Sequence, residues 1–446
     1  YAAMDWLLRR QPLIEKKLAA RYLADGALVL YDVTSSYYEG RTCPLMRIGY
    51  NRDCQPFGMG QNGKRGKTQV IYGLLADGKG RPLAVEAYAG NVGDAATVGD
   101  QVDKLKRRFG FKRVVLVGDR GMLTQARIEA LKAHPGLGWI SALRASAVRG
   151  LADEGALQLS LFDGRNIAGI ASPAFPGGRL VACYNPLLAD QRRRKREDPL
   201  AATERQLDKI VRQVRRRTRR PLDGAEIGRK VGAVIDRFKM GKHFHVAMGD
   251  GVFAYDRRQA SIRREAELDG IYVIRTSESG ERLPTGDAVR RYKDLAHVER
   301  AFRCLKGVDV LIRPIRPIRH RDERRVRAHI FLCLLAYYVE WHLRKALAPL
   351  LFDDGELDAE RKTRDPVAPA EPSASAKRKK ALRSTPDGLP IHSFETLLAD
   401  LGTLCRHLRR LKSDPDAPAF QQLTEPTPLH KRAFGLIEAF PVPGKV

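Results

Sequence analysis

The stretch LVLYDVTSSYYEG, residues 28–40, begins as a strand because its first residues are apolar and prone to β-structure. A single carboxylate, Asp32, stands where this apolar run gives out. The stretch VVLVGDRGML, residues 114–123, repeats the arrangement, with Asp119 directly after a run typical of a buried strand. If the two strands are neighbours in a mixed sheet, both carboxylates lie at one edge. For each residue alone, however, a turn or a helix N-cap is the commoner role.

A third carboxylate lies in a segment that predicts a helix by its apolar residues at steps of three, four and three. These apolar residues are Leu295, Val298, Phe302 and Leu305. Tyr292, Glu299 and Lys306 are spaced by seven residues and form a second, polar row along the same predicted helix. Arg303, four residues after Glu299, lies near Glu299 on this helix; the ordinary alternative is a solvated face with one Glu–Arg pair.

Taken together, these segments resemble the DDE transposases of bacterial insertion sequences, in the IS-four-like group with the signature Tyr-x2-Arg-x3-Glu-x6-Lys. Tyr292, Glu299 and Lys306 occupy three of its four places, and Leu295 stands where the signature has Arg, so that Lys293 or Arg303 is the expected substitute. LYDVTSSYYEG resembles the first acidic motif, VGDRGML resembles the second, and the likeness covers most of residues 3–345.

This resemblance implies an RNase H-like catalytic core in which Asp32, Asp119 and Glu299 are catalytic and hold Mg²⁺, with Mn²⁺ as a substitute. It also implies that Tyr292, Arg303 and Lys306 contact DNA. The expected activity is cut-and-paste transposition on double-stranded DNA, both element ends and target, by a homodimer in the bacterial cytoplasm at the nucleoid. Carboxylates suit this chemistry, because two ions about 4 Å apart stabilise the attacking and leaving oxygens of a phosphoryl transfer.

Composition agrees with a partner that carries phosphates. The chain has 446 residues, a formal net charge of +28 and a pI near 10.1, which attracts it to nucleic acid or to anionic membranes. No apolar run reaches the roughly 18 residues of a membrane span. The six cysteines form no CxxC pair, so a zinc knuckle is not indicated and a reducing compartment is expected.

The order of predicted elements from residue 27 is strand, hairpin, helix, strand, helix, strand. The hairpin turns at Asp77-Gly78, and the next helix is expected to begin with Asp94 as its N-cap. Between Asp119 and Glu299 lie 179 residues, too many for one loop in a compact domain, so an inserted domain is required. We therefore expect an α/β fold whose mixed-sheet core is interrupted by an insertion of a basic helix and β-strands.

The basic helix is expected within residues 191–220, which carry 13 Lys or Arg and 4 Asp or Glu, a local balance of +9. Its apolar seam indicates that it packs against other structure. The seam consists of Leu207, Ile210, Val211 and Val214. Arg215, Arg216 and Arg217 are expected to bind DNA through its phosphates; a solvated helix that only aids solubility is the alternative.

The expected domains end with a change of composition after Leu351. Residues 351–390 are rich in charge, Pro, Ala and Ser and should form a mostly disordered linker, followed by a helix over residues 393–412. Because the chain begins at Tyr1 inside a predicted helix, we expect an N-terminal segment to be missing. The expected ranges are an N-terminal helical segment 1–26, core 27–145, insertion 146–284, core 285–350, linker 351–390 and a short helical C-terminal segment 391–446.

Two alternatives to a transposase remain open from the sequence. One is an RNase H-like nuclease that cuts DNA without joining it. The other is a basic nucleic-acid-binding protein without enzymatic activity, whose carboxylates have structural roles. The three acidic segments in order favour the transposase.

Overall fold

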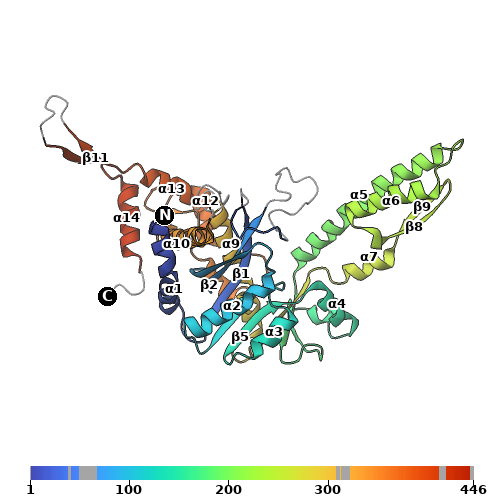
Figure 1. The fold of residues 1–446 in the computed structure, drawn as a ribbon, viewed down its shortest axis with the longest axis horizontal. Helices are drawn as coiled ribbons and strands as arrows, with labels where there is room; N and C mark the ends of the chain where they lie inside the picture. The colour runs from blue at the N-terminus through green and yellow to red at the C-terminus, as the bar shows by residue number, and fades with distance from the viewer. Residues whose placement is uncertain are drawn as a thin grey trace. The chain divides into compact units, whose positions relative to one another are not determined.

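The computed structural model describes residues 2–38, 42–49, 68–307, 312, 322–410 and 418–441. The chain is a mixed α/β protein (Figure 1) that divides into two compact units. The first unit comprises Tyr1–Ser141, Thr276–Pro366 and Ala370–Val446, and the second comprises Ala142–Arg275 and Val367–Pro369.

The first unit is built on a mixed sheet whose strands lie in the order β3-β2-β1-β4-β5. These strands are β1 Leu28–Tyr37, β2 Gln69–Asp77, β3 Pro82–Ala89, β4 Val114–Gly118 and β5 Leu137–Ala142. β1 runs antiparallel to β2 and parallel to β4, and β4 runs parallel to β5. The predicted hairpin is confirmed, since β2 pairs with β3 in antiparallel fashion. The carboxylate of Asp77 accepts hydrogen bonds at 2.9 Å from the backbone N–H groups of Lys79 and Arg81, which holds the turn.

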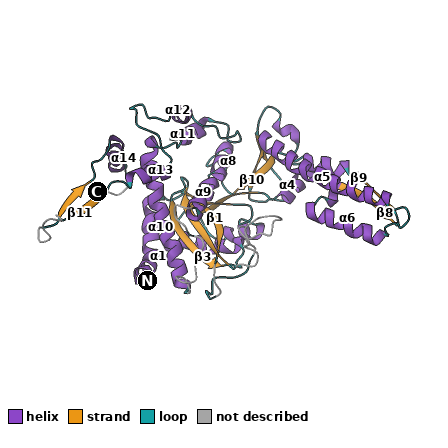
Figure 2. Cartoon of the chain, turned by 90° about the horizontal axis from the view of Figure 1, so that it is seen from above, coloured by secondary structure: helices purple, strands orange, loops and turns teal. Residues whose placement is uncertain are grey.

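Helices make up much of the rest of the first unit (Figure 2). They are α1 Ala2–Tyr22, α2 Val98–Asp103, α3 Gln125–Lys132, α8 Thr285–Lys293, α9 Leu295–Lys306, α10 Glu323–Leu347, α11 Leu357–Thr363, α12 Ala374–Leu382, α13 Phe394–Leu401 and α14 Pro428–Ala439, with short helical turns at Asp94–Thr97, Lys104–Arg108 and Ala348–Leu350. α1 and α10 pack together against β3, and α9 packs against β1. In the described part of the chain, no helix is both long enough and apolar enough to cross a membrane.

Two local predictions in this unit were wrong in detail. The first concerns Asp94, which is not the N-cap of its helix, because Gly93 holds that position. Asp94 lies in the first helical turn, where its negative charge still stabilises the N-terminus of the helix.

The second concerns the polar row that begins at Tyr292, which does not follow one helix. Tyr292 belongs to α8 and Glu299 to α9, and the backbone N–H of Asp294 between them bonds to the carbonyls of both Arg290 and Arg291, which tightens the last turn of α8.

Residues 351–390, which we expected to be mostly disordered, contain α11 and α12 in the structure. Hydrogen bonds between basic side chains and backbone carbonyls, on the segment or reaching it from elsewhere, explain the difference, because composition alone does not reveal them. Arg290 donates to the carbonyls of Arg361 and Arg364, and Lys379 donates to that of Ala348 at 2.8 Å. The side chain of Val367 is almost fully buried. A segment poor in apolar residues is thus ordered by contacts with the rest of the chain.

The helix expected over residues 393–412 is also shorter than predicted. α13 ends at Leu401, just before Gly402, and a β-ribbon follows, in which β11 Arg406–Arg409 pairs with β12 Phe420–Leu423. The pairing partner explains the error, because β12 comes from a Pro-rich region that gives no strand signal of its own. α14 then begins at Pro428 with a capping box formed by Thr427 and His430.

The second unit contains strands in the order β10-β7-β6 and a separate hairpin of β8 and β9. Its elements are α4 Ala145–Asp153, a turn at Leu159–Phe162, β6 Ile167–Ile170, β7 Arg179–Tyr184, α5 Pro186–Arg216, α6 Gly224–Phe238, a turn at Gly241–His243, β8 Phe244–Gly249, β9 Val252–Arg257, α7 Gln259–Ala266 and β10 Ile271–Thr276. Asn185 caps α5 by accepting hydrogen bonds from the backbone of Leu187 and Leu188. The predicted apolar seam of α5 packs on α6, β8 and β9. The seam therefore joins the core of its own unit.

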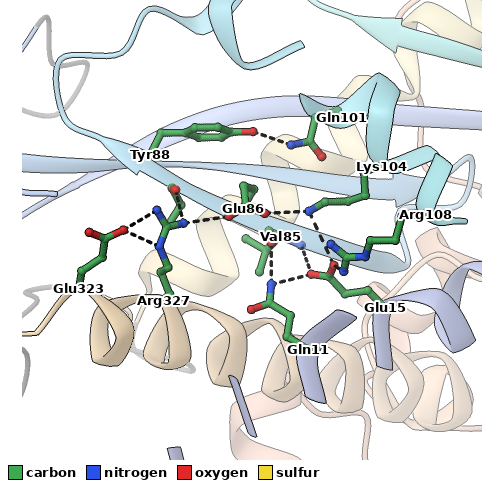
Figure 3. Close-up of polar contacts among 11 residues, drawn as sticks. Gln11, Glu15, Val85, Glu86, Tyr88, Gln101, Lys104, Arg108, Glu323 and Arg327 are labelled. Atoms are coloured by element: carbon green, nitrogen blue, oxygen red, sulfur yellow. Dashed lines mark hydrogen bonds and ion pairs between the residues drawn. The ribbon is translucent and has the colours of Figure 1, made fainter. Parts of the chain in front are cut away.

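A buried carboxylate ties α1 to the sheet of the first unit (Figure 3). Glu15 is fully buried and forms ion pairs with Arg108 and with Lys104, the latter at 3.7 Å. It also accepts hydrogen bonds from Gln11 at 2.7 Å and from the backbone N–H of Val85 at 3.1 Å. A buried charge is tolerated only when it is paired and hydrogen-bonded, and this carboxylate meets both conditions.

Lys104 extends the same network toward α10. Its ammonium lies 3.2 Å from Glu86 on β3, and Glu86 pairs with Arg327 of α10 at 2.9 Å. Arg327 also pairs with Glu323 and donates to the carbonyl of Ala87. One chain of charges thus joins both helices to β3 (Figure 3).

Replacing Glu15 by Gln should destabilise the protein by about 3 kcal/mol, because Lys104 and Arg108 are deprived of a buried counter-charge. Urea unfolding of the variant measures this effect. Glu129→Gln removes a carboxylate from an exposed pair with Lys132 and should change the free energy of unfolding by less than about 1 kcal/mol. Equal effects of the two substitutions would contradict a structural role for Glu15.

Candidate active site

The register of β1 on β4 places two carboxylates side by side. The parallel pairing runs from Leu28↔Val115 to Tyr31↔Gly118, so Asp32 and Asp119 are the next residues on the two strands. Neighbouring strands lie about 4.8 Å apart, and both aspartates are half-buried. The expectation that these two strands are neighbours in a mixed sheet is confirmed by this register.

The reason for their meeting differs in one respect from the prediction. Asp119 does follow the end of its strand, but Asp32 lies inside β1, which continues to Tyr37. β1 continues because β2 supplies an antiparallel partner for every residue from Val29 to Tyr37. What ends just before Asp32, at Tyr31, is the pairing with β4.

Backbone groups hold both aspartates in place. The carboxylate of Asp32 accepts a hydrogen bond of 2.8 Å from the backbone N–H of Val33. The chain turns directly after β4, where the carbonyl of Asp119 accepts hydrogen bonds from the N–H groups of Met122 and Leu123 at 3.0 and 3.1 Å. Met122 and Leu123 are buried in the core beneath the sheet, which fixes this turn.

Tyr292 joins the pair from α8. Its hydroxyl donates to Oδ1 of Asp119 at 3.4 Å. Burial raises the pKa of Tyr292, and the negative charges of Asp119 and, more weakly, Asp32 raise it further. The phenol therefore stays protonated at neutral pH and remains a hydrogen-bond donor. The structure brings Tyr292 to the carboxylates, a contact that the sequence did not predict.

Glu299, the third predicted carboxylate, lies on α9. The apolar stripe of this helix is buried as predicted, and Phe302 packs edge-on against Tyr72 with ring centroids 5.9 Å apart. Glu299 and Arg303 are exposed, and Lys306 is half-buried. Among the described residues, no three or more His, Cys, Asp or Glu side chains gather closely enough to hold a metal ion. The structure thus brings Asp32 and Asp119 together but does not assemble Glu299 with them into a ligand set.

The pair of aspartates by itself has the chemistry of a cation site. Carboxylate oxygens are the ligands preferred by Mg²⁺, which usually takes one or two carboxylates and retains water. Two neighbouring carboxylates repel each other, and a cation between them relieves this repulsion. Asp32 and Asp119 are therefore the residues that would hold a divalent ion.

A hollow of about 740 Å³ lies between α9, α10 and the turn after β2, and the sequence did not predict it. Arg300 and Arg303 of α9 line it together with Tyr337 and Trp341 of α10. The spacing of four between Tyr337 and Trp341, with basic residues on the next turn, is a signal that could have identified this face.

The basic residues predicted to bind DNA lie at the end of α5 in the second unit. Arg215, Arg216 and Arg217 are exposed there. A shallow hollow of about 360 Å³ at this end is lined almost entirely by basic side chains. Its lining residues are Lys209, Arg212, Gln213, Arg216 and Arg217. This surface has the charge needed to contact phosphates.

The chain matches one protein-family model, described as the transposase DDE domain, over residues 29–339. This range contains Asp32, Asp119, Tyr292 and Glu299. No curated protein matches the chain.

Solved structures with a detectable likeness include a piggyBac transposase synaptic complex with hairpin DNA. It is 9% identical, with a TM-score of 0.35, and the match covers 80% of this chain and 52% of that one. A Mos1 transposase paired-end complex with the left transposon end is 16% identical, with a TM-score of 0.18, over 34% of this chain and 45% of that one. The chain thus spans about half the length of each of these structures.

Replacing Asp119 by Asn should abolish stabilisation of the protein by Mn²⁺. A ligand at a hundredfold excess over its Kd stabilises the folded state by about 2.7 kcal/mol, which thermal unfolding detects as a raised Tm. Without metal, the variant should be at least as stable as the parent, because the repulsion with Asp32 is removed. Asp103→Asn, at an exposed position of α2, is the control and should keep the full Mn²⁺ effect. Equal Mn²⁺ stabilisation of Asp119→Asn and the parent would reject the metal assignment.

Proposed function

This chain belongs to the transposase DDE domain family, and we propose that it cuts DNA at the ends of a bacterial insertion sequence and joins the freed ends to target DNA. The chain is a DDE transposase, an enzyme of DNA transposition. The observation that carries the proposed reaction is the neighbouring pair Asp32 and Asp119, set by the register of β1 on β4 within the matched range.

In this proposal Asp32 and Asp119 hold Mg²⁺, with Mn²⁺ as a substitute, and Glu299 is the third catalytic carboxylate. Bound divalent ions stabilise the attacking and leaving oxygens of an in-line displacement at phosphorus. The N–H of Val33 and the hydroxyl of Tyr292 orient the two aspartates through the hydrogen bonds described above. Glu299 lies on the helix that packs against β1, the strand of Asp32, which supports its assignment.

We further propose that the core is RNase H-like, with the second unit inserted in it, and that the chain belongs to the IS-four-like group. Leu295 stands at the Arg position of that group's signature, and its side chain is buried on the core face of α9. An apolar residue there cannot contact a phosphate. Arg303, exposed on the same helix, supplies the cation instead, alongside Tyr292 and Lys306.

The proposed DNA partners are the element ends and the target duplex. The exposed end of α5 binds phosphates, and its side chains carry no evident pattern for reading bases. The protein acts as a homodimer on DNA, in the bacterial cytoplasm at the nucleoid. Cut-and-paste transposition is the proposed pathway, and a nuclease that cuts without joining is the second candidate.

Asp32→Ala should abolish Mg²⁺-dependent cleavage and strand transfer, because one of the two neighbouring carboxylates is removed, while DNA binding stays within about twofold of the parent. Both reactions are measured on a duplex that carries the element ends, with joined products separated from cleaved ones on denaturing gels. Cleavage without any joined product in the parent enzyme would favour the nuclease. Retained catalysis in the variant would reject the assignment of Asp32.

Replacing Arg215, Arg216 and Arg217 by Ala should reduce the salt dependence of DNA binding. On duplex DNA the slope of log K against log salt falls by about 0.9 for each phosphate that the protein no longer neutralises. The weakening should be similar for unrelated sequences, because phosphates carry no sequence information. Fluorescence anisotropy from low to moderate salt measures the slope.

The matched control removes the same charge from exposed positions elsewhere in the second unit, at Arg229, Arg237 and Arg263. The control should have a slope of log K against log salt closer to that of the parent than the slope of the α5 variant is. An unchanged slope in the α5 variant would leave this helix without a DNA role, and a weakening confined to one sequence would indicate base readout instead.

A further inference from the structure

The β-ribbon between α13 and α14 has no place in the site described above. Both views of the chain show it extending beyond these two helices, all within the first unit (Figures 1 and 2). Each of its eight strand residues is exposed. Apolar side chains are among them, with Leu408 and Leu423 exposed by 72% and 66%. A ribbon that buries none of its own strand residues contributes little to folding, so its composition needs another explanation.

The chemistry of the ribbon is basic and rich in hydrogen-bonding groups. β11 carries Arg406, His407 and Arg409, β12 carries Gln421 and Gln422, and neither strand contains a carboxylate. In the register, each apolar residue lies opposite a polar one, as the pairs Arg406↔Leu423, Leu408↔Gln421 and Arg409↔Phe420 show. Each face of the ribbon therefore presents a cation and an amide, and neither face forms a continuous apolar patch.

We propose that this ribbon enters the major groove of duplex DNA. The inference rests on the proposed function, since it takes the DNA substrate of that function as its partner. The major groove, about 12 Å wide, admits a two-stranded β-ribbon. Arginine bonds to phosphates or to guanine, glutamine can bond to adenine at two atoms, and apolar side chains contact the methyl group of thymine. The arginine, glutamine and apolar side chains of the ribbon thus each have a base edge or methyl group to contact in the groove, and His407 is the one ribbon side chain without such a partner among those named.

Docking on a second protein copy is the competing use of such a ribbon. Protein interfaces of this kind have a buried apolar core and few charges at their centre. In the ribbon, Arg406 and Arg409 lie directly opposite apolar side chains. A protein partner that covered these apolar side chains would also bury both arginines, and neither strand of the ribbon has a carboxylate to pair with them. DNA supplies the negative charge along both walls of the groove.

The base of the ribbon allows a clean deletion. The backbone N–H of Thr424 donates to the carbonyl of Cys405 at 3.0 Å, and the N–H of Cys405 donates to Oγ1 of Thr424 at 3.1 Å. The two ends of the ribbon are therefore adjacent. A Gly-Gly turn replacing residues 406–423 joins them without stretching α13 or α14.

The test compares full-length parent, the ribbon deletion and Arg406→Ala/Arg409→Ala for binding to an element-end duplex. The double substitution should lower the salt slope by up to about 1.8, at about 0.9 for each phosphate that is no longer neutralised, and weaken binding about tenfold or more at 0.1 M salt. Methylation of guanine N7, which lies in the major groove, should interfere with binding of the parent at positions where it no longer affects the deletion variant.

Lys377→Ala/Arg378→Ala removes two exposed charges from α12 in the same unit and is the matched control, which should keep the parent's interference pattern. Parent-like DNA affinity, salt slope and methylation interference in the deletion variant would overturn the inference and leave the proposed function intact. Loss of dimer mass in solution with unchanged DNA affinity would also overturn it, in favour of a protein partner. Failure of the parent to bind DNA at all would instead contradict the proposed function.

Discussion

The parallel pairing of β1 with β4 is the constraint on which the candidate site depends. Because this pairing stops at Tyr31↔Gly118, the next residues of both strands are carboxylates held at strand spacing. β2 keeps β1 extended past that point, and the turn anchored by Met122 and Leu123 ends β4. Two rigid backbones thus hold a pair of like charges that neither strand would bring together alone. Such an arrangement costs stability unless a cation or a hydrogen-bond donor such as Tyr292 offsets it.

Two buried carboxylates elsewhere in the first unit are paired with cations instead. Glu15 of α1 lies among Arg108, Lys104 and the backbone N–H of Val85, so its charge is matched and serves to join helices to β3. Asp294, buried between α8 and α9, is matched by Arg291 and Arg361. The paired charges hold the helices of the first unit together and against β3, whereas Asp32 and Asp119 are neighbouring carboxylates of like charge on the sheet. This contrast distinguishes structural carboxylates from candidate catalytic ones.

Much of the secondary structure followed from the sequence, because periodicity and turn chemistry are local. The hairpin at Asp77, the buried stripe of α9 and the seam of α5 are examples. The wrong predictions are those in which contacts with residues far away in the sequence determine the local structure. Residues 351–390 are ordered by carbonyl contacts with Arg290 and by Lys379, and β11 exists because β12 pairs with it. Neither signal is visible in a window of neighbouring residues.

For the site, the sequence by itself determined which residues are the candidates for the chemistry. A carboxylate after each of two apolar runs, and a polar row beside a helical stripe, identified Asp32, Asp119, Tyr292 and Glu299. Only the tertiary structure decided how they meet. Strand register set Asp32 beside Asp119, and the break at Asp294 placed Tyr292 on α8 within reach of Asp119, while Glu299 lies on the exposed face of α9. The reason is physical: residue type and spacing are local properties of the chain, whereas the distance between side chains depends on how separate elements pack.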